Sequence, residues 1–189
     1  GPDLLLRTDG ALDAAGRALL AAFAAKHGLP RIAWARGNGV PEIAAQLAPA
    51  SITLSGVPVT PGPGAFLQAS PDGEQAIIAA MLAALPAKLA GRGRIADLHA
   101  GYGTLSLPLA RRGRVTAFES DGAAVAALAN AAAKAGLPLA AIRRDLVRQP
   151  LTVAELAPFA AVVLDPPFTG AAEQAALLAR SAVPAVIYV

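Results

Sequence analysis

The chain has 189 residues, enough for one full domain and a smaller lobe, and 55% of them are hydrophobic while only 15% are charged. Arg, Asp, Gly or Pro interrupts the apolar stretches well before the roughly 18 residues that a membrane-spanning helix needs, so we expect no membrane span. The lack of Cys excludes a disulfide framework and a thiolate metal site and agrees with the reducing cytoplasm, while the net charge of +3 permits a nucleic-acid partner.

Residues 1–63 are predicted to form a small α+β lobe. Gly28 and Pro30 mark the end of its one helix, and the Pro- and Gly-rich run from Pro61 to Gly64 is expected to break the secondary structure. We therefore place a second domain at residues 64–189. The segments expected in the first lobe are a strand over 4–8, a helix over 12–26, strands over 32–36 and 51–60, and an ambiguous stretch over 41–50.

The second domain is predicted to alternate helices with strands, as α/β domains do. Ser70 is its first N-cap, with Pro71 at the first helical position. The expected order is a helix over 70–85, a strand ending at residue 97, a helix over 104–110, a strand over 115–118, a helix over 121–135, a strand over 139–143, a helical turn over 152–157, a strand over 160–164, a helix over 171–179 and a strand over 183–189.

The segment from Ile95 to Asp121 is the centre of this domain. Its first strand ends in Asp97, a turn with Gly101 and Gly103 follows, and the second strand ends in Glu119, about 20 residues after the first. Glycines allow a sharp turn and let a ligand approach without a Cβ in the way. An acid at the end of the second strand can accept both hydroxyls of a ribose.

The acid before these glycines helps to choose the ligand. Asp97 would repel a pyrophosphate, so a dinucleotide such as NAD fits the turn poorly. A ligand with a ribose and a neutral or cationic middle fits better. S-adenosylmethionine is such a ligand, and we expect it as the cofactor.

A second signal follows the strand over 160–164, whose continuous apolar run AAVVL is typical of a strand covered on both faces. It ends in Asp165, Pro166, Pro167 and Phe168. The two prolines cannot continue a strand ladder, so they are expected to hold a rigid turn that aims Asp165 at the ligand.

The arginines fall at both ends of the expected sheet. Arg143 and Arg144 follow a strand, on the ligand side, and are the better candidates to hold a substrate. For most of the arginines the favoured alternative is a solvated loop charge that keeps an apolar chain soluble. Five others precede strands and should lie at the opposite edge: Arg92, Arg94, Arg111, Arg112 and Arg114.

The sequence DLHAGYGTLSLPLA, residues 97–110, resembles the first motif of class I S-adenosylmethionine-dependent methyltransferases, and it looks most like that of the RNA 5-methyluridine methyltransferase family. The resemblance runs from about Leu4 to Val189 and includes Gln68 and the DPP and VIYV sequences. It implies a Rossmann-like methyltransferase sheet, incomplete at the C-terminus and preceded by the small α+β lobe. The cofactor-binding residues that it implies are Gln68, Asp97, His99, Gly101, Tyr102, Gly103, Glu119, Ser120, Asp145 and Asp165.

For two of these residues, Gln68 and Asp145, the sequence differs from the family or allows another role. The family has an Asn where this chain has Ser70, close to Gln68. Asp145 falls where the fold offers an acceptor to the adenine amino group, but a helix N-cap is an alternative role for it. The two His, His27 and His99, are far apart, and we expect no metal site.

The resemblance implies methyl transfer to carbon 5 of a uridine in rRNA or tRNA. That reaction needs a Cys thiolate at carbon 6, and the chain has no Cys. In the family the Cys belongs to a Ser-Cys-Asn-Pro motif directly after the fifth strand, one residue beyond Val189. We therefore expect a fragment, truncated after the fifth strand, that binds the cofactor but is inactive alone.

Two alternatives remain open from the sequence. Asp165, Pro166 and Phe168 match the motif of methyltransferases that act on an exocyclic amine of RNA or DNA, in which the aromatic ring stacks on a flipped base and no Cys is needed. The chain could instead be a complete non-catalytic module that binds cofactor or RNA.

Overall fold

The computed structural model describes residues 3–68, 70–87, 89 and 93–189. Arg92, expected beside the first strand of the central segment, lies outside the described residues. The chain divides into two compact units, which we call unit 1 (up to Ile52, with residues 60–66) and unit 2 (residues 53–59 and 67–189). The boundary after residue 63 stays a prediction, and the contacts group residues 53–59 with unit 2.

Unit 1 is a small three-stranded sheet with one helix. Its strand order is β1-β2-β3, with β1 and β2 parallel and β3 antiparallel to β2. The Asp13 side chain caps the helix by accepting the Gly16 N–H, and Gly28 ends it in the left-handed conformation. The small α+β lobe expected from the sequence is present, and the ambiguous stretch contains a strand. The elements are β1 (Asp3–Thr8), α1 (Ala14–His27), β2 (Arg31–Arg36) and β3 (Glu42–Gln46).

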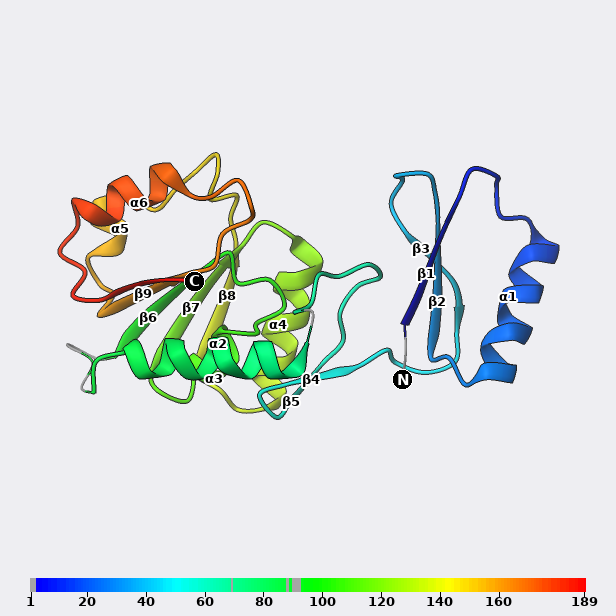
Figure 1. Cartoon of the computed structure of the whole chain (residues 1–189), viewed down its shortest axis with the longest axis horizontal. Coiled ribbons are helices and arrows are strands. Elements are labelled where there is room, and N and C mark those ends of the chain that lie inside the picture. The colour runs from blue at the N-terminus through cyan, green and yellow to red at the C-terminus, as the bar shows by residue number, and fades with distance from the viewer. Residues whose placement is uncertain (1–2, 69, 88, 90–92) are drawn as a thin grey trace. The chain divides into compact units, whose positions relative to one another are not determined.

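Unit 2 begins with a two-stranded hairpin and continues as an α/β domain (Figure 1). The hairpin is β4 (Ile52–Leu54) and β5 (Val57–Val59). The helices are α2 (Pro71–Ala84), α3 (Ser106–Leu109), α4 (Gly122–Lys134), α5 (Val153–Leu156) and α6 (Ala172–Ala179). The remaining strands are β6 (Arg94–Leu98), β7 (Arg114–Glu119), β8 (Leu139–Arg143), β9 (Ala161–Leu164) and β10 (Val186–Tyr188).

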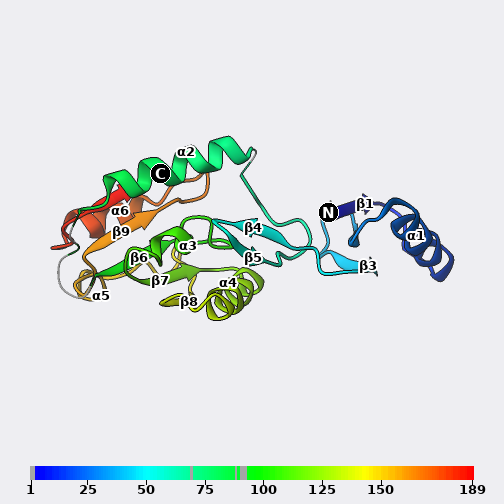
Figure 2. The ribbon, with the colours of Figure 1, turned by 90° about the horizontal axis from the view of Figure 1, so that it is seen from below.

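The five strands from β6 to β10 form one parallel sheet in the order β10-β9-β6-β7-β8. Figures 1 and 2 show α2, α3 and α4 on one face of this sheet and α5 and α6 on the other. The order reverses between β6 and β9, because the chain adds β7 and β8 on one side of β6 before it returns to the other side. This is the Rossmann-like arrangement predicted from the sequence, and such a reversal is where open α/β sheets bind ligands.

The core of unit 2 lies on both faces of this sheet. All four residues of β9 are buried, as the run AAVVL predicted. One cluster of the core packs under α5 and α6 and consists of Ala96, Leu98, Phe118, Leu146, Leu151, Leu156, Val162, Leu164 and Leu178. The central strands are therefore held from both sides, which fixes where their carboxyl ends lie.

Two elements are shorter than the sequence predicted. The helix expected over 104–110 is the single turn α3, because its end tightens: the Arg112 N–H donates to the Leu109 carbonyl three residues back. The strand expected over 183–189 is reduced to Val186–Tyr188, since Pro184 has no N–H to give to a ladder.

The strand β10 is at the edge of the sheet, and its Val186 and Tyr188 side chains are exposed. An apolar cavity of about 240 Å³ lies beside it, lined by Leu164, Ala175, Leu178, Ala179, Val186 and Tyr188. Among the described residues, no helix has the length and apolar character needed to cross a membrane.

Candidate functional site

The carboxyl ends of four parallel strands bring the predicted acidic residues to one edge of the sheet, which we call the carboxyl edge. Asp97 lies in β6 at the level of Ala117 in β7 and Val163 in β9. Glu119 ends β7, and Asp165 follows β9, where its N–H donates to the Leu98 carbonyl over 3.3 Å. Since all strands run the same way, the acids that end them meet at this edge.

Asp97 is the most deeply buried of these acids, with 1% of its surface exposed. Its Oδ2 accepts a hydrogen bond from the Ser106 hydroxyl in α3. Its Oδ1 is buried and has no partner among the described residues. Burial raises the pKa of Asp97 to about 7, with the Ser106 hydrogen bond opposing the shift and the charges of Asp165 and Glu119 adding to it.

His99 lies among the other acids of the carboxyl edge. Its backbone adopts the left-handed conformation, with φ of 63°, and within the described chain its buried Nε2 has no hydrogen-bond partner. Burial lowers the pKa of His99, while the charges of Glu119, Asp165 and Asp145 act in the opposite direction. Burial raises the pKa of Asp165, and His99 opposes that shift. The imidazole therefore feels the charge of all three carboxyl groups, and it directly follows β6 at the same edge of the sheet.

The glycine turn packs between β6 and β7. The Gly101 N–H donates to Glu119 Oε2 over 2.9 Å, and Gly101 has a φ of 52°. Gly103 has a φ of 97°, and a Cβ placed there would lie 2.3 Å from Leu128 Cδ1 in α4. Tyr102, between the two glycines, is buried. The turn therefore needs glycine at Gly103 for both conformation and space.

The Glu119 carboxylate is oriented by backbone donors. Its Oε1 accepts the Ser120 N–H at 2.7 Å, the Ser120 hydroxyl at 3.0 Å and the Asp121 N–H at 2.9 Å. Its Oε2 accepts only the Gly101 N–H among the described contacts. A carboxylate oxygen has two lone pairs, so Oε2 keeps capacity for one further donor such as a hydroxyl.

Asp145 follows β8 and accepts hydrogen bonds within a turn, and not at the start of a helix as the alternative reading of the sequence expected. Its Oδ1 accepts the N–H groups of Val147 at 3.1 Å and Arg148 at 3.2 Å. Its Oδ2 lies 3.6 Å from the Arg148 guanidinium. Asp145 thus holds its own turn, and contact with an adenine stays a prediction.

The turn after β9 presents an aromatic ring to solvent. The Gly170 N–H donates to the Pro167 carbonyl over 2.7 Å and closes the turn. Phe168 is fully exposed, while Pro166 is half-buried. Gln68 is also half-buried, and no hydrogen bond of the described residues joins it to the acids of the carboxyl edge.

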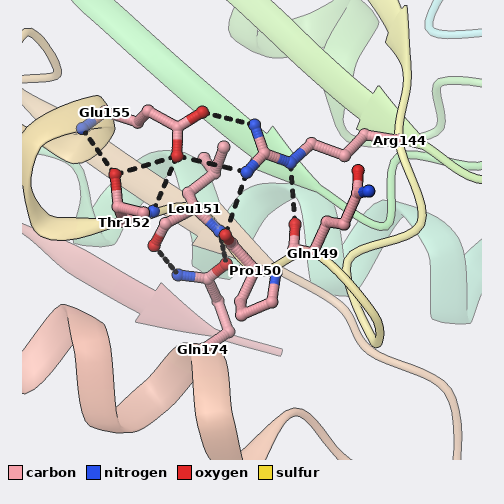
Figure 3. A network of polar contacts seen from close by, with 7 residues as sticks. All are labelled: Arg144, Gln149, Pro150, Leu151, Thr152, Glu155 and Gln174. Carbon is pink, nitrogen blue, oxygen red and sulfur yellow. Dashed lines mark hydrogen bonds and ion pairs between the residues drawn. The ribbon is translucent and has the colours of Figure 1, made fainter.

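Arg144 makes contacts within the chain that the sequence did not reveal. The sequence made it a candidate to hold substrate, but its guanidinium makes four hydrogen bonds within the chain (Figure 3). Two go to the Glu155 carboxylate at 2.5 and 3.1 Å, and the others go to the carbonyls of Gln149 and Pro150. Arg143 donates to the Ser120 carbonyl over 3.1 Å.

This network also contains contacts that the sequence analysis missed (Figure 3). Thr152 and Glu155 form a capping box, and the Ser/Thr-x-x-Glu spacing could have revealed it. The buried Gln174 amide donates to the Leu151 carbonyl and accepts the Leu151 N–H, a tertiary contact with no local signal. The network fixes the chain between β8 and β9, next to the carboxyl edge.

The order of the strands, the glycine turn and the acids of the carboxyl edge together define a class I methyltransferase fold. The model of the methyltransferase small domain family matches residues 56–184. The chain belongs to this family and is a methyltransferase domain, as the resemblance of its first motif predicted.

Relatives and a solved structure agree with this family. A Brucella melitensis protein described as an uncharacterized RNA methyltransferase is 46% identical over 133 residues, which are 69% of this chain and 31% of that protein. The 23S rRNA (uracil(1939)-C(5))-methyltransferase RlmD of Chromohalobacter salexigens is 34% identical over 177 residues, 88% of this chain and 36% of that protein. The chain thus spans about a third of the length of these relatives.

The fold is also similar to that of the Pyrococcus abyssi tRNA (uracil-54, C5)-methyltransferase, solved in complex with S-adenosyl-L-homocysteine. The TM-score is 0.69 at 17% identity, and the match covers 97% of this chain and 45% of that one. In the part of the chain that the structure describes, no group of His, Asp and Glu residues is arranged to hold a metal ion.

Proposed function

We propose that this chain binds S-adenosylmethionine at the carboxyl edge and forms the cofactor domain of an RNA methyltransferase that acts on carbon 5 of a uridine in rRNA or tRNA. The relatives are named RNA methyltransferases, and one of them is named for uracil C5 in 23S rRNA. The observation that carries the proposal is that Asp97, Glu119 and Asp165 lie at the carboxyl ends of neighbouring strands, with His99 directly after β6, at the reversal point of the sheet.

The residues of the carboxyl edge fit this cofactor. Buried polar atoms without a partner are rare, and within the described residues Asp97 Oδ1 and His99 Nε2 are two of them, at and just after the end of β6. The free lone pair of Glu119 Oε2 suits a ribose hydroxyl, and the backbone at Gly101 is open to a close approach, since a Cβ there would meet nothing within 4 Å.

Each remaining residue of the predicted set has a role within the proposal. Asp97 and Asp165 supply negative charge near a cationic sulfonium and ammonium. Tyr102 and Gly103 shape the turn, and Ser120 orients the Glu119 carboxylate through two hydrogen bonds. Asp145 and Gln68 are proposed to contact the adenosine and methionine portions of the ligand. The bound cofactor would supply the electrophilic methyl group.

The nucleophile is proposed to come from outside these residues. Methyl transfer to carbon 5 requires a thiolate that adds to carbon 6 and is expelled after a base removes the carbon 5 proton. The chain contains no Cys, so it cannot provide that thiolate. We therefore expect the isolated chain to bind cofactor without forming 5-methyluridine.

Mass spectrometry of nucleosides tests this proposal directly. The chain is incubated with total RNA and methyl-labelled S-adenosylmethionine, and the RNA is then digested to nucleosides. We expect cofactor binding without labelled 5-methyluridine. Robust formation of 5-methyluridine would refute the need for an external thiolate.

The exposed Phe168 favours one second candidate, an exocyclic-amine methyltransferase. Its ring stands free directly after Asp165, Pro166 and Pro167, where it could stack on a flipped base. Labelled N-methyladenosine, N-methylguanosine or N-methylcytidine in the same digest would establish this candidate in place of the uridine enzyme. Loss of that product in Phe168→Ala would then assign the stacking role.

A further inference from the structure

The amino ends of the same five strands carry a charge pattern that the cofactor site does not explain. The connections there, residues 84–94, 110–114, 134–139, 157–161 and 179–186, contain no Asp or Glu in the sequence. Among the described residues of these connections, six are basic and exposed, and we call this set the basic edge: Arg94, Arg111, Arg112, Arg114, Lys134 and Arg180. Both ends of one sheet thus carry charge of opposite sign.

No ion pair within the described part of the chain joins the basic edge to a carboxylate. Among the residues that the structure describes, the ion pairs hold other arginines: Arg17, Arg31, Arg144 and Arg148. Arg111 donates to the Ser55 carbonyl over 2.7 Å, which fixes its side chain without neutralising its charge. The positive charge of this edge is therefore available to an anion from outside the chain.

Two of these arginines are direct neighbours across β6 and β7. Arg94 and Arg114 are partners in the parallel register, so their side chains leave the same face of the sheet. Neighbouring strands lie about 4.8 Å apart, and like charges at that position destabilise a sheet. An anion bound between the two guanidinium groups would remove this repulsion.

The backbone draws the connections of the basic edge together. A Cβ on Gly113 would lie 2.2 Å from the Gly93 carbonyl oxygen, so these glycines allow the two connections to touch. The Arg114 N–H donates to the same Gly93 carbonyl over 2.9 Å. A cavity of about 230 Å³ lies at this place, with Arg112 in its lining. Gly93 and Gly113 therefore lie in contact at the starts of β6 and β7, beside a hollow that Arg112 lines.

We propose that the basic edge contacts the phosphate backbone of the substrate RNA at the end of the domain opposite the cofactor. That the bound polyanion is RNA rests on the proposed function. Guanidinium groups bind phosphate through paired hydrogen bonds, and unpaired exposed arginines release counterions from RNA when they do so. Strands of five or six residues separate the two edges by roughly 17 Å, so a folded RNA needs to extend only that far beyond its target nucleotide.

Salt-dependent RNA binding tests this contact. Binding of a fluorescein-labelled RNA stem-loop is followed by fluorescence anisotropy from about 50 to about 250 mM KCl. The test variant is Arg94→Gln/Arg114→Gln, and the control Arg94→Lys/Arg114→Lys keeps both charges. Binding of S-adenosylhomocysteine, measured by calorimetry, reports that each variant is folded.

We expect the Gln variant to bind RNA about tenfold more weakly at low salt and to lower the slope of log affinity against log salt by about 1.5, since two phosphate contacts are lost. The Lys variant should keep the slope, and all proteins should bind S-adenosylhomocysteine equally.

Two results would overturn the proposal while the proposed function stands. One is an unchanged affinity and slope in the Gln variant, and the other is an equal loss in the Gln and Lys variants. A wild-type chain that binds S-adenosylhomocysteine but no RNA at any salt would refute both the basic edge and the RNA substrate.

Discussion

The two ends of the five-stranded sheet hold their charges in opposite ways. At the carboxyl edge, Asp97 is buried and Glu119 and Asp165 are half-buried, and backbone groups or hydroxyls hold the first two. At the basic edge, Arg94 and Arg114 are exposed and have no carboxylate partner among the described residues. Buried, oriented charge selects a small ligand by geometry, whereas exposed charge attracts a polyanion with little selectivity.

The separation follows from the parallel topology. Every strand of this sheet runs in the same direction, so a residue after a strand reaches one edge and a residue before a strand reaches the other. In this sheet Asp97, Glu119 and Asp165 lie at the carboxyl ends of strands, whereas Arg94 and Arg114 begin the strands β6 and β7. The following substitutions test how residues at and near the two edges affect stability, from the largest expected effect to the smallest.

Removal of the buried acid should stabilise the protein at neutral pH. The folded pKa of Asp97 is raised to about 7, so between pH 4 and 7 the folded state keeps a proton that the unfolded state releases. Stability should therefore fall as pH rises through this window and stay level above it. Asp97→Asn avoids this loss, and above pH 7 it should be more stable than wild type by about 4 kcal/mol.

Urea denaturation at about pH 4.5, 6 and 8 measures this difference. The advantage of Asp97→Asn should be small at the lowest pH and largest at the highest. A difference between the two proteins that does not change with pH would show that Asp97 ionises normally.

A methyl group in the glycine turn should disrupt the carboxyl edge. Gly103→Ala places a Cβ 2.3 Å from Leu128 Cδ1 in a residue with a φ of 97°. The strain and the overlap should together cost about 3 kcal/mol of unfolding free energy. Gly101→Ala is the matched control, since its Cβ meets nothing within 4 Å.

Gly101→Ala should lower the free energy of unfolding by only about 1 kcal/mol, the ordinary cost of an alanine in the left-handed conformation. Urea denaturation of both variants gives the comparison. Equal losses at Gly101 and Gly103 would contradict the packing of this turn against α4.

The ion pair of Glu155 tests what a partnered arginine contributes, in contrast to the unpaired arginines of the basic edge. The hydrogen bond from Arg144 and that from the Thr152 backbone lower the pKa of Glu155 to about 2. Its contribution should be complete above the unfolded pKa and disappear as pH falls through about 2. Because the Glu155 side chain is 42% exposed, solvent screening reduces that contribution to about 1 kcal/mol.

Glu155→Gln keeps the capping geometry and removes the charge, so it isolates this contribution. Thermal unfolding should give a lower melting temperature than wild type at pH 7 and the same one near pH 2. A melting temperature that equals wild type at pH 7 would mean that the pair contributes nothing.

Reversal of one charge at the basic edge should have the smallest effect on stability. Arg114→Glu converts a like-charge pair with Arg94 into an opposite pair. We expect a gain of about 0.5 kcal/mol in unfolding free energy at low salt, which high salt should screen. Arg180→Glu is the control, because Arg180 has no strand partner, and it should change stability less.

The sequence predicts most of this fold because its signals are local. The apolar run of β9, the glycine that ends α1 and the prolines after β9 each act on their own segment. The strand β3 was ambiguous because its partner β2 determines it, and its register shifts beside Ile32. The helix α3 was overestimated because an apolar composition does not reveal how early a turn tightens.

The candidate site divides in the same way. The positions of Asp97, Glu119 and Asp165 at one edge of the sheet could be predicted because each lies at or next to the last residue of a strand. The bond from Ser106 to Asp97, the pairing of Arg144 with Glu155 and the contact of Gln174 with Leu151 join different elements. Such contacts depend on tertiary packing, so the sequence could name Arg144 as a candidate to hold substrate without revealing its bonds to Glu155, Gln149 and Pro150.

The most direct test of the cofactor site is titration calorimetry with S-adenosylhomocysteine, on the wild-type chain and on Glu119→Ala. We predict one molecule bound per wild-type chain and binding at least about tenfold weaker in the variant, because the ribose loses its acceptor. A wild-type chain that unfolds cooperatively in urea yet binds no S-adenosylhomocysteine would contradict the assignment of the carboxyl edge.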